Sequence, residues 1–184
     1  MRRRVRAGRA ALLLAAIAAL ACAGCRRAPP GPAAAAGAAA GKTETATVTL
    51  LFPGADGMLH AETRPVALPL PADARVEAIV AALLAGPKTA GLAATMPPGV
   101  ALTDAYVDPQ GVAYLDFGAK DQPQPPASGS ELELLRVYSV VDTVTGAEPR
   151  VRAVVLLWNG SQRTTFAGHV DTTSPLLADR RWVR

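Results

Sequence analysis

The sequence predicts one small α+β domain in which two amphipathic helices pack on an antiparallel or mixed sheet. Three observations support this fold class. Two segments carry apolar residues at helical spacing, two pairs of extended segments flank turn sequences, and about 140 residues remain after a distinctive N-terminal region, which is the size of one domain. Because only 4% of the residues are aromatic, the core must consist mainly of aliphatic side chains.

The first 24 residues have the pattern of a signal peptide. Five arginines precede an apolar segment that runs from Ala10 to Ala23. This segment has about 14 residues, whereas a helix needs about 20 to cross the hydrocarbon core of a membrane. A charged start followed by a short apolar run therefore predicts an export signal over residues 1–24.

Cys25 follows this segment and is the predicted site of lipid attachment. Ala23 and Gly24 lead directly into it, which resembles the lipobox of bacterial lipoproteins. In such a box the thiol receives a diacylglyceryl group, and a peptidase cuts immediately before the modified cysteine. Cys22 is an alternative acceptor, but glycine before Cys25 suits the cleavage site better. A redox or metal-binding C-x-x-C pair is the other interpretation, and the chain offers no second ligand pair to support it.

Residues 25–42 are predicted to be a flexible tether, because they are almost entirely Ala, Pro and Gly after Arg26 and Arg27. The charge of the remaining chain argues against a nucleic-acid partner. The whole chain has a formal net charge of +4, but residues 43–184 contain 11 basic and 15 acidic side chains, a net charge of −4. An acidic domain does not attract phosphates.

Two extended segments open the folded part. Residues 47–52 alternate and are rich in β-branched side chains, and turn formers occupy residues 53–57. Residues 59–70 form a second extended segment. Pro65 and Pro69 place this segment at the edge of a sheet, because proline cannot donate a ladder hydrogen bond.

The first helix is predicted to begin at Asp73, whose side chain can cap it, and to stop at Gly86 and Pro87. A hairpin follows, in which residues 100–108 and 112–117 flank the turn at residues 108–111. The apolar positions of the helix have the spacing i, i+3, i+4, i+7 and i+8, and they are Val76, Ile79, Val80, Leu83 and Leu84.

The second helix is predicted from Ser130, which has capping-box spacing with Glu133, to Gly146. Residues 151–158 and 162–170 then flank Asn159 and Gly160, a strong signal for a hairpin, and residues 154–157 have the apolar character of a central strand. The apolar stripe of this helix consists of Leu134, Val137, Tyr138, Val141 and Val144.

These segments, from residue 48 to about residue 177, resemble in order and spacing the GerMN domain of sporulation and spore-germination lipoproteins. The resemblance implies a GerMN-like domain over residues 43–178, a fold related to the ring-building motifs of secretion-system scaffolds, and no established catalytic centre. The landmarks are the strand at 48–52, Ala82-Leu-Leu-Ala-Gly-Pro87, Met96-Pro-Pro-Gly99, the strand at 112–117, Ser139-Val-Val-Asp-Thr143, and the run from Val154 to Gly160.

Residues 179–184 remain as a basic C-terminal tail. Arg180, Arg181 and Arg184 surround Trp182 in this segment. Such a tail either frays or docks on an acidic partner.

Candidate catalytic groups are few. The sequence contains neither G-x-S-x-G nor H-E-x-x-H. His60 and His169 are expected in exposed or satisfied positions rather than as metal ligands. Asp104, Asp108 and Asp116 could meet across the first hairpin as a carboxylate pair. The better explanation is that Asp108 belongs to the turn and that Asp104 and Asp116 lie on a solvated face.

Asp171, Thr172 and Thr173 are interpreted as a turn rather than a ligand cage. We therefore expect no catalytic residue, cofactor or metal site.

The expected function is that of an exported, lipid-anchored envelope protein, held on the cell membrane or the outer membrane by Cys25. Its domain acts as a module that assembles with another envelope protein or with itself, without nucleic acid. A module that binds a small ligand, such as a peptidoglycan fragment, is the alternative.

Overall fold

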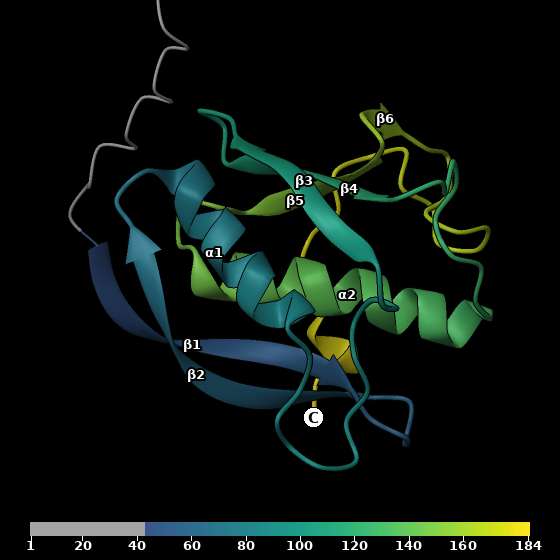
Figure 1. The fold of residues 1–184 in the computed structure, drawn as a ribbon, viewed down its shortest axis with the longest axis horizontal. Helices are drawn as coiled ribbons and strands as arrows, with labels where there is room; N and C mark the ends of the chain where they lie inside the picture. The colour runs from purple at the N-terminus through teal and green to yellow at the C-terminus, as the bar shows by residue number, and fades with distance from the viewer. Residues whose placement is uncertain (1–42) are drawn as a thin grey trace, which may run out of the picture. The chain divides into compact units, whose positions relative to one another are not determined.

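Two helices lie between two sheets in the computed structural model, which describes residues 43–184 (Figure 1). The export signal, the lipid acceptor Cys25 and the tether expected over residues 1–42 lie outside the described residues. The elements are β1 (Thr43–Pro53), β2 (Leu59–Pro69), α1 (Ala72–Leu84), β3 (Val100–Val107), β4 (Val112–Ala119), α2 (Ser130–Ala147), β5 (Ala153–Trp158), β6 (Ser161–Gln162) and the short 3₁₀ helix η1 (Arg180–Trp182).

The predicted α+β class is confirmed, with one addition that the sequence did not indicate. β1 and β2 form a separate antiparallel ribbon, paired from Thr43 opposite Pro69 to Pro53 opposite Leu59. The other sheet has the order β3-β4-β5-β6, and it is mixed because β5 lies parallel to β4. The ribbon covers one side of the helices and the four-stranded sheet covers the other (Figure 1).

Alternation along the ribbon separates its two faces. Val48, Leu50 and Phe52 on β1 are buried against the helices, whereas the threonines between residues 43 and 49 are exposed. Pro65 and Pro69 lie on β2 at positions that face away from β1, as the sequence predicted for an edge strand.

Four of the five positions in the predicted apolar stripe of α1 are buried and the fifth, Leu84, is half-buried, but the predicted cap at Asp73 is wrong. The helix begins at Ala72 after Pro71, and no side chain caps its first turn. The Asp73 carboxylate instead accepts a hydrogen bond of 2.7 Å from the N–H of Val107. It binds there because the start of α1 lies beside the end of β3, so that a distant backbone donor takes the place of a local one.

Arg64 of β2 completes the other end of α1. Its Nη1 and Nη2 atoms donate to the carbonyl oxygens of Ala82 and Gly86 at 3.2 and 2.6 Å, and its Nε donates to Glu62 at 2.6 Å. The last carbonyls of a helix lack partners within the helix, and a cation there is favourable. Gly86 has a φ of +80°, which confirms the predicted stop.

The capping box predicted for α2 is wrong. Gly129 is the N-cap, Ser130 is exposed and caps nothing, and the helix ends at Ala147. Glu133 points into the domain and accepts hydrogen bonds from the backbone of residues 167–170. The carboxylate therefore holds a loop that is distant in sequence, rather than the helix end beside it.

The two hairpins differ in how closely they follow the prediction. The first is confirmed, with Asp108 accepting from the N–H groups of Gln110 and Val112. In the second, Asn159 and Gly160 form the predicted turn with φ values of +50° and +77°. Its second strand, β6, has only two residues, because Leu176 occupies the adjoining edge of β5.

Residues 179–184 pack on the domain. Trp182 and Val183 cover the cluster of Leu51, Leu59 and Leu135. The N–H of Arg184 donates to Leu59 at 2.9 Å. The folded unit therefore includes these residues, which the charge pattern had set apart as a tail.

Removing residues 179–184 should lower the free energy of unfolding by about 2–4 kcal/mol, because it exposes these three leucines. Urea denaturation of the full chain and of the truncated chain measures the difference. Arg181→Ala, which removes one exposed side chain from the same segment, serves as the control and should cost less than about 1 kcal/mol. Equal stability of the truncated and full chains would contradict the packing described here.

Candidate functional site

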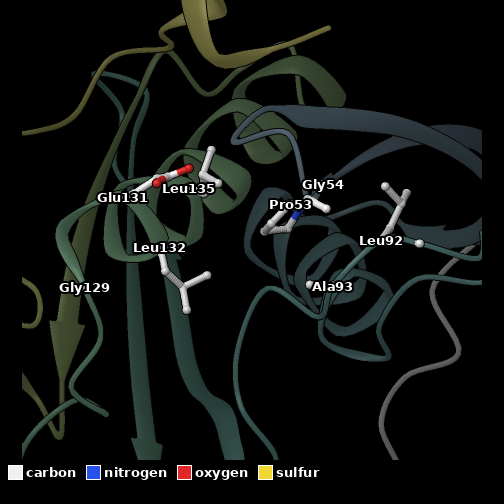
Figure 2. Close-up of a pocket in the computed structure, with 10 residues that line it drawn as sticks. Pro53, Gly54, Leu92, Ala93, Gly129, Glu131, Leu132 and Leu135 are labelled. Atoms are coloured by element: carbon white, nitrogen blue, oxygen red, sulfur yellow. The ribbon is translucent and has the colours of Figure 1, made fainter.

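An apolar groove opens where the end of β1, the loop after α1 and the first turn of α2 meet (Figure 2). Its volume is about 560 Å³. The residues that line it are Pro53, Gly54, Ala55, Gly91, Leu92, Ala93, Gly129, Glu131, Leu132 and Leu135.

Two backbone contacts hold the walls of the groove together. Ala93 donates its N–H to the carbonyl of Pro53 at 2.8 Å, and Leu92 pairs with Gly54 in an isolated β-bridge. The loop after α1 is thereby fixed against the end of β1. The loop after α1 and the end of β1 therefore form one wall of the groove, and the start of α2 forms the opposite wall.

Leu132 is the most exposed apolar side chain among the helical residues of the groove. Its side chain is 37% exposed, whereas Leu135 one turn further along α2 is buried. Figure 2 shows both leucines on the side of α2 that faces Pro53 and Ala93. An apolar side chain that fills this space would remove Leu132 from water, which is favourable.

The polar groups of the groove are sparse. Glu131 contributes its carboxylate at the rim, and no side chain caps the first N–H groups of α2. Gly57, which has a φ of +72°, lies so close to Glu131 that a Cβ there would approach the carboxylate to 2.5 Å. The lining contains no histidine, cysteine, serine, lysine or arginine, so it offers no nucleophile and base in contact.

Neither histidine is among the residues that line this groove, although the ring of His60 lies against Gly54, and each histidine pairs with a carboxylate. His60 Nε2 lies 2.9 Å from Asp56 Oδ1 on the ribbon. His60 and Arg184 lower the pKa of Asp56 to about 2. His169 Nδ1 lies 2.8 Å from Glu133 Oε2. Each histidine therefore has a hydrogen-bonding partner in the domain.

The three aspartates of the first hairpin are used by the backbone. Asp104 and Asp116 face each other in the register of β3 and β4. Asp116 accepts from the N–H of Gly160 with both oxygens, at 2.8 and 2.9 Å, and Asp104 accepts from Ala105. Together with the turn role of Asp108, these bonds explain the carboxylates without a catalytic pair.

Asp171 likewise belongs to a turn. Its Oδ1 atom accepts from the N–H and the hydroxyl of Thr173 at 2.9 and 2.7 Å. Across residues 43–184, no group of three or more His, Cys, Asp or Glu side chains could hold a metal ion. The same part of the chain has no helix with the length and apolar character to cross a membrane.

Two buried carboxyl groups of α2 have shifted pKa values in opposite directions. Burial alone would raise the pKa of Glu133, but hydrogen bonds from Val170, Ala167 and His169 outweigh it and hold the pKa below its usual value. Burial raises the pKa of Asp142, whose Oδ1 accepts from the N–H of Asp179. Both groups fix distant segments and neither lines the groove.

The groove could not be predicted from the sequence. Leu132 stood outside the predicted apolar stripe of the second helix, and Leu92 and Ala93 lay in an unassigned loop. The one signal in the sequence was that Leu132, an apolar residue, lies in the first turn of the second helix before the predicted stripe begins at Leu134. That signal identifies an exposed leucine but cannot show which segments lie opposite it.

The fold and the groove define the described chain as a two-sheet α+β domain with one apolar surface site at a helix start. A family model described as Germane, sporulation and spore germination, matches residues 42–164. The chain belongs to this family. The resemblance to GerMN domains is thereby confirmed.

Solved structures share the fold at low sequence identity. The tandem GerMN domains of the sporulation protein GerM from Bacillus subtilis match with a TM-score of 0.54 and 21% identity, over 77% of this chain and 48% of that chain. The first GerMN domain of the same protein matches with a TM-score of 0.51 and 23% identity, over 74% and 99%.

A candidate lipoprotein from Clostridium perfringens matches with a TM-score of 0.51 and 14% identity, over 75% of this chain and 89% of that chain. Identities in this range show the fold alone. The comparison with curated proteins finds no match.

Glu133→Gln should lower the free energy of unfolding by roughly 2 kcal/mol or more, because an amide NH₂ would face the N–H groups that the carboxylate now accepts. The folded pKa is lowered, so this stabilisation is present above the unfolded value of about 4.5 and is lost as the pH falls through the folded pKa. Urea denaturation at pH 7 and at successively lower pH measures it. The exposed neighbour substitution Glu131→Gln is the control, and an equal, pH-independent loss in both variants would refute the role of Glu133.

Proposed function

We propose that this chain is a lipid-anchored envelope protein whose domain binds an apolar side chain of a partner envelope protein in the groove. The family supports a sporulation or germination setting. The observation that carries the proposal is the apolar groove beside Leu132, formed by three elements that the fold holds together.

The chemistry of the groove favours binding over catalysis. Its walls are mostly apolar, and Glu131 is its only ionisable side chain. A site of this kind has a suitable shape for one or two apolar side chains with backbone contacts at the α2 start. Outside the groove, the carboxylates of Asp108, Asp171 and Glu133 bind the backbone of turns and loops.

The anchor part of the proposal rests on the N-terminal sequence. An acyl chain contributes about 0.8 kcal/mol for each CH₂ group buried in the membrane, and stable anchoring needs two signals, such as two chains. A diacylglyceryl group on Cys25 provides two chains. The domain surface would then be free to bind a protein, because it need not bind the membrane.

A second candidate function, binding of a peptidoglycan fragment, is favoured by a different hollow of about 410 Å³ beside the first hairpin. Tyr106 is 53% exposed there and lies 6.2 Å from Tyr114, measured between ring centroids. Arg150 lines the same hollow. A tyrosine face can pack on a sugar and a guanidinium can pair with a peptide carboxylate. Binding to purified sacculi that Tyr106→Ala removes and Leu132→Asp leaves intact would favour this function instead.

Leu132→Asp should weaken partner binding about tenfold or more, because a buried leucine contributes about 1.5–3 kcal/mol. The full chain, with a photoreactive residue in place of Glu131, is irradiated in membranes, and the protein adduct is quantified. Leu177→Asp is the matched control, because Leu177 is 65% exposed and lies outside the groove. A discrete adduct that only Leu132→Asp reduces is expected. An adduct that both variants leave unchanged, or the absence of any protein adduct, would contradict the proposal.

Cys25→Ser should abolish lipid attachment and move the chain out of the membrane fraction, since the acceptor thiol is lost. Cys22→Ser is the control and should leave the lipid in place. Mass spectrometry of the N-terminal peptide identifies the modified residue. A lipid mass on a peptide that begins at Cys22 would assign the anchor to the other cysteine.

A further inference from the structure

The sheets of this domain have four outer edges, and three of them are covered or interrupted. On β3, the N–H groups of Val107 and Ala105 are bound by Asp73 and Asp104, at 2.7 and 2.9 Å. An edge whose donors are already bound by carboxylates cannot accept another strand without breaking those bonds.

The free side of β5 is covered and the outer edge of β2 is interrupted. β6 and Leu176 cover β5, with Leu176 and Val154 exchanging hydrogen bonds of 2.7 and 2.9 Å. On β2, Pro65 and Pro69 have no N–H at outward positions, and the N–H of Arg184 occupies the carbonyl of Leu59. The edge of β5 is thus covered, and the row of outward donors on β2 is interrupted at Pro65 and Pro69.

The outer edge of β1 is closed at one end only. The N–H of Leu51 donates to Thr143 Oγ1 at 3.0 Å, and its carbonyl accepts from Ser139 Oγ at 2.6 Å. These bonds show that the N–H and C=O of Leu51 point away from β2. Alternate residues of a strand share this direction, so the same groups of Thr49, Thr47 and Thr45 point outward too.

These outward groups are unoccupied. Within residues 43–184, the backbone of Thr45, Thr47 and Thr49 makes no hydrogen bond to any segment beyond the ribbon. The three side chains are exposed and none is charged. This five-residue segment, Thr45–Thr49, is called the open edge below.

We infer that the open edge pairs with the open edge of a second copy of this chain, in antiparallel register about Thr47. Thr47 would lie opposite Thr47 of the other copy, and Thr45 opposite Thr49. Threonine pairs across antiparallel strands are favourable, and no like charges would meet. Because Pro65 and Pro69 interrupt the outer edge of each β2, the assembly stops at a four-stranded sheet of two ribbons.

The position of the open edge in the chain favours a second copy as the occupant. Only 17 residues, 26–42, separate the proposed lipid on Cys25 from β1, and they can span at most about 60 Å. A twofold axis normal to the membrane would bring the start of each β1 to the same height above it. Tethering to one membrane raises the effective concentration of the copies for each other, so that a short strand contact suffices.

This inference rests on the proposed role in assembly, but it uses a surface separate from the groove. Hydrogen exchange of the full chain in detergent, combined with light scattering, tests it. We expect a dimer whose amides at Thr45, Thr47 and Thr49 exchange slowly, and faster exchange when dilution separates the copies. A monomer at all concentrations, or a dimer in which these amides exchange as fast as in the monomer, would overturn the inference.

Thr47→Pro should weaken the dimer about tenfold or more, because each copy loses the central hydrogen-bond donor. Thr63→Pro is the matched control, since Thr63 occupies an outward position on β2 of the same ribbon. Pro65 lies opposite Thr47 and shows that the ribbon accepts proline at an outward position.

Equal dimerisation of the two proline variants would overturn the inference. If Thr47→Pro unfolds the chain, Thr47→Lys with Thr63→Lys as control replaces the pair, because two lysines would face each other only at position 47. Leu132→Asp should leave dimerisation unchanged, so failure of the groove and failure of the open edge give different results.

Discussion

Polar side chains buried along α2 determine how the rest of the domain is arranged. A buried polar group without a partner costs free energy, so each of these side chains must bind a group from another segment. The partners are the loop at residues 167–170, Leu51 of β1 and Asp179 of the C-terminal segment. α2 thereby connects the ribbon, the loop at residues 167–170 and the end of the chain. The four side chains are Glu133, Ser139, Asp142 and Thr143.

The same constraint explains where the surface features lie. Successive helical residues are about 100° apart, so the rotation of α2 that buries Glu133 turns Leu132 towards the groove. Ser139 and Thr143 reach β1 only at Leu51, which leaves the preceding part of that edge without a cover. The groove and the open edge are therefore both consequences of how one helix satisfies its buried polar groups, although they lie on separate surfaces.

The local predictions were wrong where a polar side chain binds a segment that is distant in the sequence. Asp73 and Glu133 stand at helix starts, where carboxylates commonly cap, yet they bind the backbone of β3 and of the loop at 167–170. The second strand of the last hairpin is shorter than predicted for a related reason, since Leu176 pairs with the same edge of β5 as β6 does. Leu132 was overlooked because its exposure is significant only when the loop after α1 lies opposite.

The sequence by itself determined both helices, the turns at Asp108 and Asn159, the edge character of β2 and the family, and Cys25 stays a predicted lipid acceptor. These depend on the spacing of nearby residues and on backbone preferences, which the order of amino acids states directly. Only the tertiary structure decided the division into two sheets, the packing of residues 179–184, the groove and the open edge. Each of these depends on contacts between residues far apart in the chain, and no local pattern records which distant segments meet.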